Sequence, residues 1–89
     1  MSLVILNHRV KDYASWKPGY NADLPRRSEA GLKEIFVGTR EDDPQEVYLI
    51  FEVQDVARAQ KMLENPELHK IMDESGVIRR PSVTVLKTP

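Results

Sequence analysis

Apolar side chains gather in four short runs that predict β-strands, over residues 3–10, 32–40, 46–53 and 77–87. The run 46–53 is the densest, because six of its eight side chains are apolar or aromatic and they occupy odd and even positions alike. The opening half of 3–10 has the same character. Since successive side chains of a strand point to opposite faces, both faces of these two strands need cover, which predicts central positions in a sheet.

Between the strands, residues that favour helix N-caps precede stretches with apolar side chains at helical spacing. Asp12 is the first predicted N-cap, and its helix carries three aromatic side chains on adjoining faces: Tyr13, Trp16 and Tyr20. Pro18 and Gly19 are expected to distort this helix. A short second helical turn is predicted over residues 23–31, with Gly31 at its C-terminal end.

The second half of the chain predicts a hairpin followed by a broken helix. Pro44 fixes the turn between strands 32–40 and 46–53, and Gly38 is interpreted as a β-bulge. Asp55 is the next predicted N-cap, and Asn65 followed by proline restarts the helix. Pro81 within the run 77–87 favours an edge strand.

The resulting order is strand, helix, strand, strand, helix, strand, which is the ferredoxin-like βαββαβ arrangement of an α+β protein with an antiparallel four-stranded sheet. An internal repeat supports it, because His8-x-Val10-x-Asp12 matches Phe51-x-Val53-x-Asp55 in spacing. The repeat also assigns faces. One set is almost wholly apolar and should face the helices: Val4, Leu6, His8, Val10, Val47, Leu49, Phe51 and Val53. The other set is half polar and predicts a second sheet packed against it: Leu3, Ile5, Asn7, Arg9, Glu46, Tyr48, Ile50 and Glu52.

Composition narrows the function classes. The 89 residues are expected to form one domain, residues 1–89, and the net charge of −1 argues against a dedicated nucleic-acid binder. The absence of cysteine excludes disulfides and thiolate metal sites. The run 3–6 is too short for a signal peptide or a membrane span, so a cytoplasmic location is expected.

The chain resembles the dimeric α/β-barrel superfamily, in particular small cyclase-like proteins related to the antibiotic-biosynthesis monooxygenases. These residues carry the resemblance: His8-x-Val10-x-Asp12-Tyr13-x-x-Trp16-Lys17, Arg27-x-x-x-Gly31, Asp43-Pro44, Asn65-Pro66-Glu67-Leu68, Met72, Gly76-Val77 and Pro81. The resemblance implies that two ferredoxin-like subunits pack sheet against sheet with their helices outside. It does not imply one activity, because the superfamily includes oxygenases, isomerases, cyclases and proteins without known activity.

His8 is the candidate catalytic residue, since it ends a strand on the helix-covered face where the repeat has Phe51. Walled by Trp16 and Tyr20, its imidazole is suited to act as a general base or hydrogen-bond partner for a flat, phenol-like or enolisable molecule. The resemblance implies that cofactor-free oxygenases of the family rely on the substrate's own enolate to react with oxygen, so they need such a base and a shaped pocket but no flavin motif. The structural alternative is a buried neutral histidine bonded to a backbone carbonyl, with Trp16 and Tyr20 as core residues.

Phe51, Tyr48 and Glu52 are the further candidate ligand contacts. Tyr48 and Glu52 are predicted to line the barrel interior together with Asn7 and Arg9. The alternative is that these polar groups hydrogen-bond across a dimer interface, and an ion pair between Arg9 and Glu52 is expected. His69 is predicted to be a solvated surface residue. No metal-ligand spacing is present, and no cofactor motif is found.

Two hypotheses follow from the sequence. The first is a homodimeric α/β-barrel that binds a small, flat, apolar or aromatic molecule, with acid–base chemistry as a cofactor-independent monooxygenase or cyclase/isomerase. The alternative is a non-catalytic binding or assembly module in which His8 and Trp16 are core residues. RNA binding through the sheet is rejected, because Tyr48 and Phe51 are predicted on opposite faces and Tyr48 is flanked by acidic residues.

Overall fold

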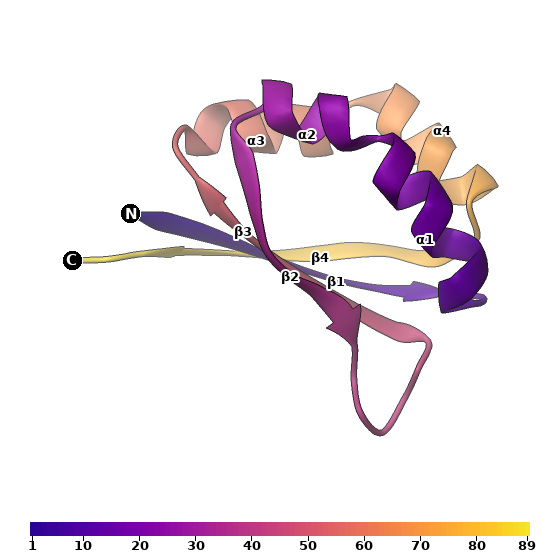
Figure 1. Ribbon diagram of the computed structural model, residues 1–89. Helices are drawn as coiled ribbons and strands as arrows, with labels where there is room; N and C mark the ends of the chain where they lie inside the picture. Colours follow the sequence, from indigo (N-terminus) through magenta and orange to yellow (C-terminus); the bar gives the residue numbers. More distant parts are fainter.

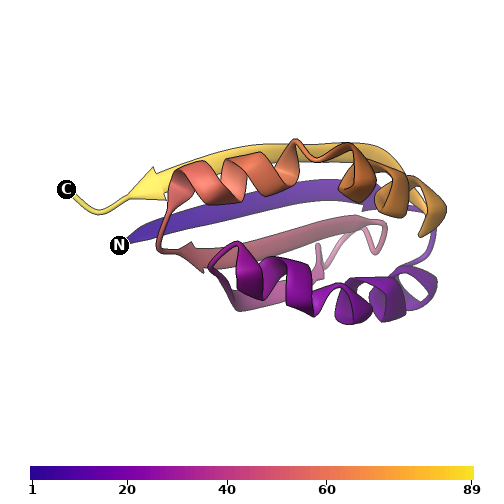
Figure 2. The same ribbon diagram turned by 90° about the horizontal axis from the view of Figure 1, so that it is seen from above.

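The computed structural model describes residues 1–89. Its elements are β1 (Ser2–Val10), α1 (Tyr13–Ala22), α2 (Leu24–Glu29), β2 (Leu32–Thr39), β3 (Glu46–Val53), α3 (Val56–Leu63), α4 (Pro66–Glu74) and β4 (Val77–Lys87). All four strands form one antiparallel sheet in the order β2-β3-β1-β4. The predicted ferredoxin-like arrangement is therefore confirmed, with the two most apolar strands in the middle (Figure 2).

All the helices lie on one face of the sheet (Figure 1). Seen from above, α1 and α2 form one row and α3 and α4 a second row beside it (Figure 2). The opposite face of the sheet has no helix over it (Figure 1). A single chain therefore supplies cover for only one side of its central strands.

The helices begin where their caps predict. The carboxylates of Asp12 and Asp55 accept hydrogen bonds from the backbone amides of Ser15 and Arg58, at 2.9 and 3.3 Å. Each bond satisfies one of the free amides of a first helical turn. Pro18 and Gly19 do not interrupt the helix, because α1 continues through both residues to Ala22.

The bulge in β2 lies elsewhere than predicted. The register shifts between Glu34 and Phe36, whereas Gly38 pairs regularly with Tyr48. A side chain at position 38 would be crowded, because a Cβ built there would lie 2.8 Å from the ring tip of Phe36. The glycine therefore leaves room for the Phe36 ring to lie against the backbone.

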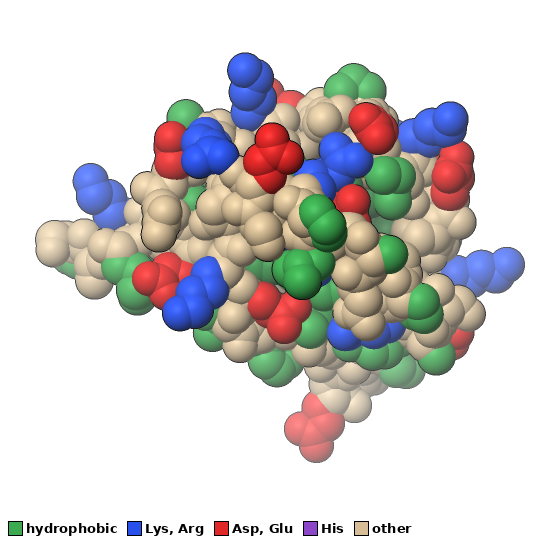
Figure 3. Space-filling view, turned by 45° about the horizontal axis from the view of Figure 1, so that its top comes forward, with side chains coloured by type: hydrophobic (Ala, Val, Ile, Leu, Met, Phe, Trp, Pro, Cys, Tyr) green, Lys and Arg blue, Asp and Glu red, His purple; other side chains and the backbone are tan.

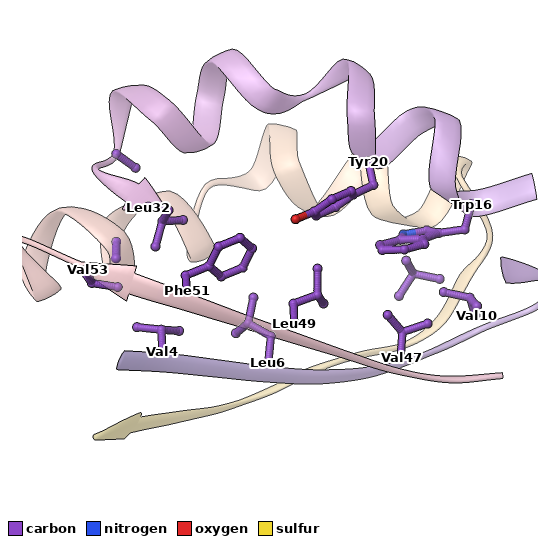
Figure 4. Packing of buried hydrophobic residues seen from close by; sticks show 13 residues of the cluster. Val4, Leu6, Val10, Trp16, Tyr20, Leu32, Val47, Leu49, Phe51 and Val53 are labelled. Atoms are coloured by element: carbon purple, nitrogen blue, oxygen red, sulfur yellow. The ribbon is translucent and has the colours of Figure 1, made fainter. Parts of the chain in front are cut away.

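The core lies between the helices and the sheet, as the repeat predicted (Figure 4). The helix-facing positions of β1 and β3 are all buried: Val4, Leu6, His8, Val10, Val47, Leu49, Phe51 and Val53. The side chains of Trp16 and Tyr20 point from α1 toward these strand residues (Figure 4). Because both side chains are buried, Trp16 and Tyr20 belong to the hydrophobic core.

Candidate functional site

A cavity of about 70 Å³ lies between the two rows of helices and the central strands. The sheet contributes its floor, and all four helices contribute walls. The lining is mostly apolar: Leu6, His8, Trp16, Gly19, Tyr20, Asp23, Arg27, Leu49, Phe51, Met62, Leu63, Leu68, Ile71, Met72, Ser75 and Pro81. Small-molecule sites are typically apolar clefts of this kind with a few polar groups, although commonly about 300 Å³ or more. The cavity therefore suits a molecule of one ring or smaller.

His8 is the buried polar group of the floor. Its side chain is 3% exposed, and neither ring nitrogen has a hydrogen-bond partner in the protein. The structural alternative, a histidine bonded to a backbone carbonyl, is therefore not what the structure contains. An unpaired buried donor or acceptor costs about 1–3 kcal/mol. Such groups are rare in folded proteins and need a reason.

Burial, with a smaller contribution from the nearby positive charge of Arg79 and against the opposing effect of Glu46, lowers the pKa of His8 to about 4. The imidazole is therefore neutral at neutral pH. In that state one ring nitrogen donates a hydrogen bond and the other accepts one. The lowered pKa also makes His8 a weaker base than free imidazole.

A row of aromatic rings leads from His8 along α1. The Trp16 ring meets the imidazole edge to face at 5.1 Å between ring centres, and Tyr20 follows at 5.0 Å from Trp16. Trp16 and Tyr20 are four residues apart, so one helix face presents both rings (Figure 4). Phe51 lines the same cavity from β3. The structure thus brings together four of the six predicted site residues.

Arg27 is the residue that the sequence-based site prediction missed. It is 8% exposed and lines the cavity from α2, with its guanidinium carbon 3.7 Å from the centre of the Tyr20 ring. One nitrogen donates to the Tyr20 carbonyl at 2.6 Å, and no carboxylate lies within ion-pair distance. The signal in the sequence was weak, because Arg26 beside it is chemically identical and forms ordinary surface ion pairs.

The opposite wall comes from α3 and α4. Met62, Leu63, Leu68, Ile71 and Met72 had been recognised as a helical apolar stripe but not as cavity lining. A stripe of this kind is normally core, and here the cavity lined by these side chains shows that they leave part of the space between helices and sheet unfilled. Met62 and Met72 are half-buried, and unbranched methionine side chains are suited to filling irregular spaces.

Tyr48 and Glu52 lie on the other face of the sheet, as their parity predicted, so they cannot contact a molecule bound beside His8. The expected ion pair between Arg9 and Glu52 was wrong. Antiparallel pairing places Glu52 opposite Leu3 at the far end of β1, and places Arg9 opposite Glu46.

Arg9 instead belongs to a polar network at one end of the open face. Its guanidinium lies 3.0 Å from Glu46 and 3.1 Å from Asp43, and Arg79 reaches Glu46 at 2.8 Å. The hydrogen bond from Arg79, followed by that from Arg9, lowers the pKa of Glu46 against the opposing effect of burial. Asp43, in the turn between β2 and β3, is therefore linked to β1 through Arg9.

His69 is not the solvated residue that was predicted. Its Nε2 lies 2.6 Å from the Leu63 carbonyl oxygen, which makes Nε2 the donor, and Nδ1 then accepts from Arg80 at 3.2 Å. The side chain links α4 to the end of α3 and to β4. No group of His, Asp or Glu side chains in the structure could hold a metal ion.

The helical surface carries acidic and basic side chains interspersed, and no histidine atom reaches the face seen in Figure 3. No patch of one sign forms there. None of the helices is both long and apolar enough to cross a membrane.

Comparison with known proteins supports the ferredoxin-like fold described above. A family model described as a domain of unknown function (DUF3764) matches residues 2–85. No curated protein matches the sequence. A candidate antibiotic biosynthesis monooxygenase from Bordetella bronchiseptica superposes with a TM-score of 0.78 at 14% identity, covering 99% of this chain and 96% of that one.

Two further solved structures are similar. An antibiotic biosynthesis monooxygenase has a TM-score of 0.67 at 16% identity, covering 100% of this chain and 99% of its own. An uncharacterised NIPSNAP domain protein from Burkholderia xenovorans has a TM-score of 0.70 at 10% identity, covering 100% and 95%. At these identities the likeness establishes the fold alone. The resemblance noted in the sequence is confirmed at that level.

Proposed function

Because the chain belongs to the family described as a domain of unknown function (DUF3764), its function has to be argued from its own site, and we propose that it is a homodimer that binds a small, mostly apolar ring-sized molecule beside His8. The likeness to monooxygenase and NIPSNAP structures is consistent with this proposal. It does not select a reaction, since one fold carries many activities.

The observation that carries the proposal is the unpaired imidazole in an apolar cavity. His8 and Trp16 are buried to almost the same depth, at 3% and 4% exposed. A core position at that depth favours an apolar side chain, as the repeat shows by placing Phe51 in the equivalent position. A histidine there stabilises nothing in the protein through hydrogen bonding, so its donor and acceptor are left for a bound molecule.

Binding has stronger support than catalysis. A neutral imidazole donates or accepts a hydrogen bond to a phenol or a carbonyl without any change of charge. As a general base for a cofactor-independent oxygenase or a cyclase/isomerase, His8 would have to gain a proton against its lowered pKa. A negative charge formed on the ligand would offset part of that cost by favouring the imidazolium.

Phenol is a suitable probe, because it has one ring and one hydroxyl group. We expect phenol to change the fluorescence of Trp16, the only tryptophan of the chain. His8→Phe should bind phenol roughly 5- to 10-fold more weakly, as expected for the loss of one hydrogen bond of about 1–1.5 kcal/mol. His69→Gln, which changes the other histidine, serves as the matched control and should bind like the wild type. Equal affinity of wild type and His8→Phe would contradict a site centred on the imidazole.

The open face of the sheet supports the second part of the proposal, a twin subunit. Phe36 and Leu86 are each 46% exposed, and their neighbours Leu3, Ile5 and Ile50 are only half-buried. Register places all five on the face without helices. Contiguous exposed apolar surface rimmed by polar groups is typical of interfaces. A second copy packed sheet to sheet would cover it and enclose the network around Glu46.

Ile50 lies at the middle of this face, opposite Ile5 on one side and Phe36 on the other. We expect the wild type to sediment at twice the chain mass at micromolar concentration, and Ile50→Glu to sediment as a single chain, since a buried unpaired carboxylate is costly. Leu24→Glu makes the same kind of change at an exposed helix position and should remain dimeric. A wild type that sediments as a folded single chain would exclude the barrel.

A further inference from the structure

We propose that the cavity selects a molecule with an anionic group, such as a small carboxylate, and that Arg27 is the residue that binds this group. The inference rests on the proposed function and specifies the chemical class of its ligand. The ligand is therefore predicted to have an apolar part that lies beside His8 and Trp16, and an acidic group that points toward α2. No feature of the comparisons assigns this role.

The charge of Arg27 is buried without a counter-charge. The side chain is more than nine-tenths covered, its one hydrogen bond goes to a backbone carbonyl, and its flat face rests on Tyr20. Moving a cation away from water is costly unless a carboxylate or a similar group pairs with it. A guanidinium has five donors arranged to hold a carboxylate with two parallel bonds, and Arg27 uses one of them inside the protein.

The acidic side chains nearby are already engaged. Asp23 also lines the cavity, but its carboxylate pairs with Arg26 at 3.2 Å. Glu34 accepts a hydrogen bond of 2.6 Å from the Tyr20 hydroxyl. Neither lies within ion-pair distance of Arg27. The cavity therefore holds one positive charge and no unpaired negative one.

A purely structural role for Arg27 would be to satisfy the Tyr20 carbonyl near the end of α1 and to pack on the Tyr20 ring. Those contacts account for the position of the side chain. A cation near the C-terminus of a helix is also mildly favourable. These contacts do not explain why the guanidinium lines an apolar cavity. Binding of an anionic ligand there would explain it.

The experiment compares molecules of equal shape and different charge. Benzoate and benzamide, and the smaller isobutyrate and isobutyramide, are titrated against Trp16 fluorescence in wild type, Arg27→Gln and the control Arg40→Gln, whose side chain pairs with Asp42 and does not line the cavity. We expect the anion of a pair to bind at least roughly tenfold more tightly than its amide in the wild type, as charge-assisted hydrogen bonds allow. Arg27→Gln should bind anion and amide about equally, and Arg40→Gln, which removes a positive charge outside the cavity lining, should keep the wild-type preference. Amide binding by Arg27→Gln shows that the variant is folded.

The outcomes separate this inference from the proposed function. Equal binding of anion and amide by the wild type, or an anion preference that survives in Arg27→Gln, would overturn the role of Arg27 and leave the cavity as a neutral site. Failure of every probe to bind, phenol included, would overturn the proposed function as well. If Arg27→Gln does not fold, Arg27→Lys replaces it. A lysine keeps the charge but lacks the planar fork, so it should lower anion affinity while amide affinity is unchanged.

Discussion

Replacing Trp16 with alanine is expected to lower the free energy of unfolding by about 3–5 kcal/mol, the range for removing a large buried aromatic side chain. Trp16 is 4% exposed and packs between Tyr13, Tyr20 and His8. Because a domain of this size has only about 5–15 kcal/mol in total, the variant should lose a large fraction of its stability. Urea denaturation followed by circular dichroism, at one fixed protein concentration, measures the change.

His8→Phe is the matched comparison, since His8 is buried as deeply as Trp16. We expect no loss of stability from this variant, and a gain of up to about 2 kcal/mol, because it removes two buried polar atoms that have no partner in the protein. Functional sites commonly trade stability for activity in this way. A loss of several kcal/mol in His8→Phe would show that the imidazole is part of the structural core, and would favour the assembly-module alternative.

Acidification is expected to destabilise the wild type through His8 well above the pH at which carboxylates protonate. The unfolded chain should bind a proton at His8 near the ordinary pKa of 6.5, whereas the folded chain binds it only near 4. The unfolded state is therefore favoured as pH falls below 6.5, and the effect is complete once pH falls below 4. Between about pH 7.5 and about pH 5 this linkage should cost the wild type about 2 kcal/mol, and about 3 kcal/mol below the folded pKa.

The comparison with His8→Phe isolates that contribution. The lowered pKa values of Asp12, Asp43 and Glu46 affect stability at more acidic pH, and both proteins share them. His69 is also common to both proteins. Chemical denaturation at a series of pH values should therefore show that the wild type loses stability more steeply than His8→Phe between pH 6.5 and 4. Parallel curves would mean that His8 gains a proton in the folded state as readily as in the unfolded one.

Much of the fold was predictable because periodicity, caps and turns agree with one another. The limits of β3 and β4 were predicted as they occur, and both N-cap aspartates are confirmed. Local preferences were less reliable guides. Gly38 was expected to mark a bulge, but the register of β2 shifts between Glu34 and Phe36, and Pro18 does not interrupt α1.

The candidate site was predictable only in part. The repeat placed His8 on the helix-covered face, and helical spacing placed Trp16 and Tyr20 near it. Arg27 could not be found in this way, because the difference between a paired surface arginine and an unpaired buried one lies in the packing of α2 against α1. The partner of Arg9 was predicted wrongly because it depends on the register between β1 and β3. The alternation of side chains gives the face of each residue but does not give that register.

The most direct test is a nitrogen-15 NMR spectrum of the His8 ring, recorded with and without excess phenol. We predict that the free protein shows a neutral imidazole at neutral pH, and that phenol shifts a His8 ring nitrogen and gives nuclear Overhauser contacts to Trp16 and Leu49, both of which line the cavity. Unchanged His8 resonances, with no contacts from phenol to either residue, would contradict the proposal that this cavity is a binding site.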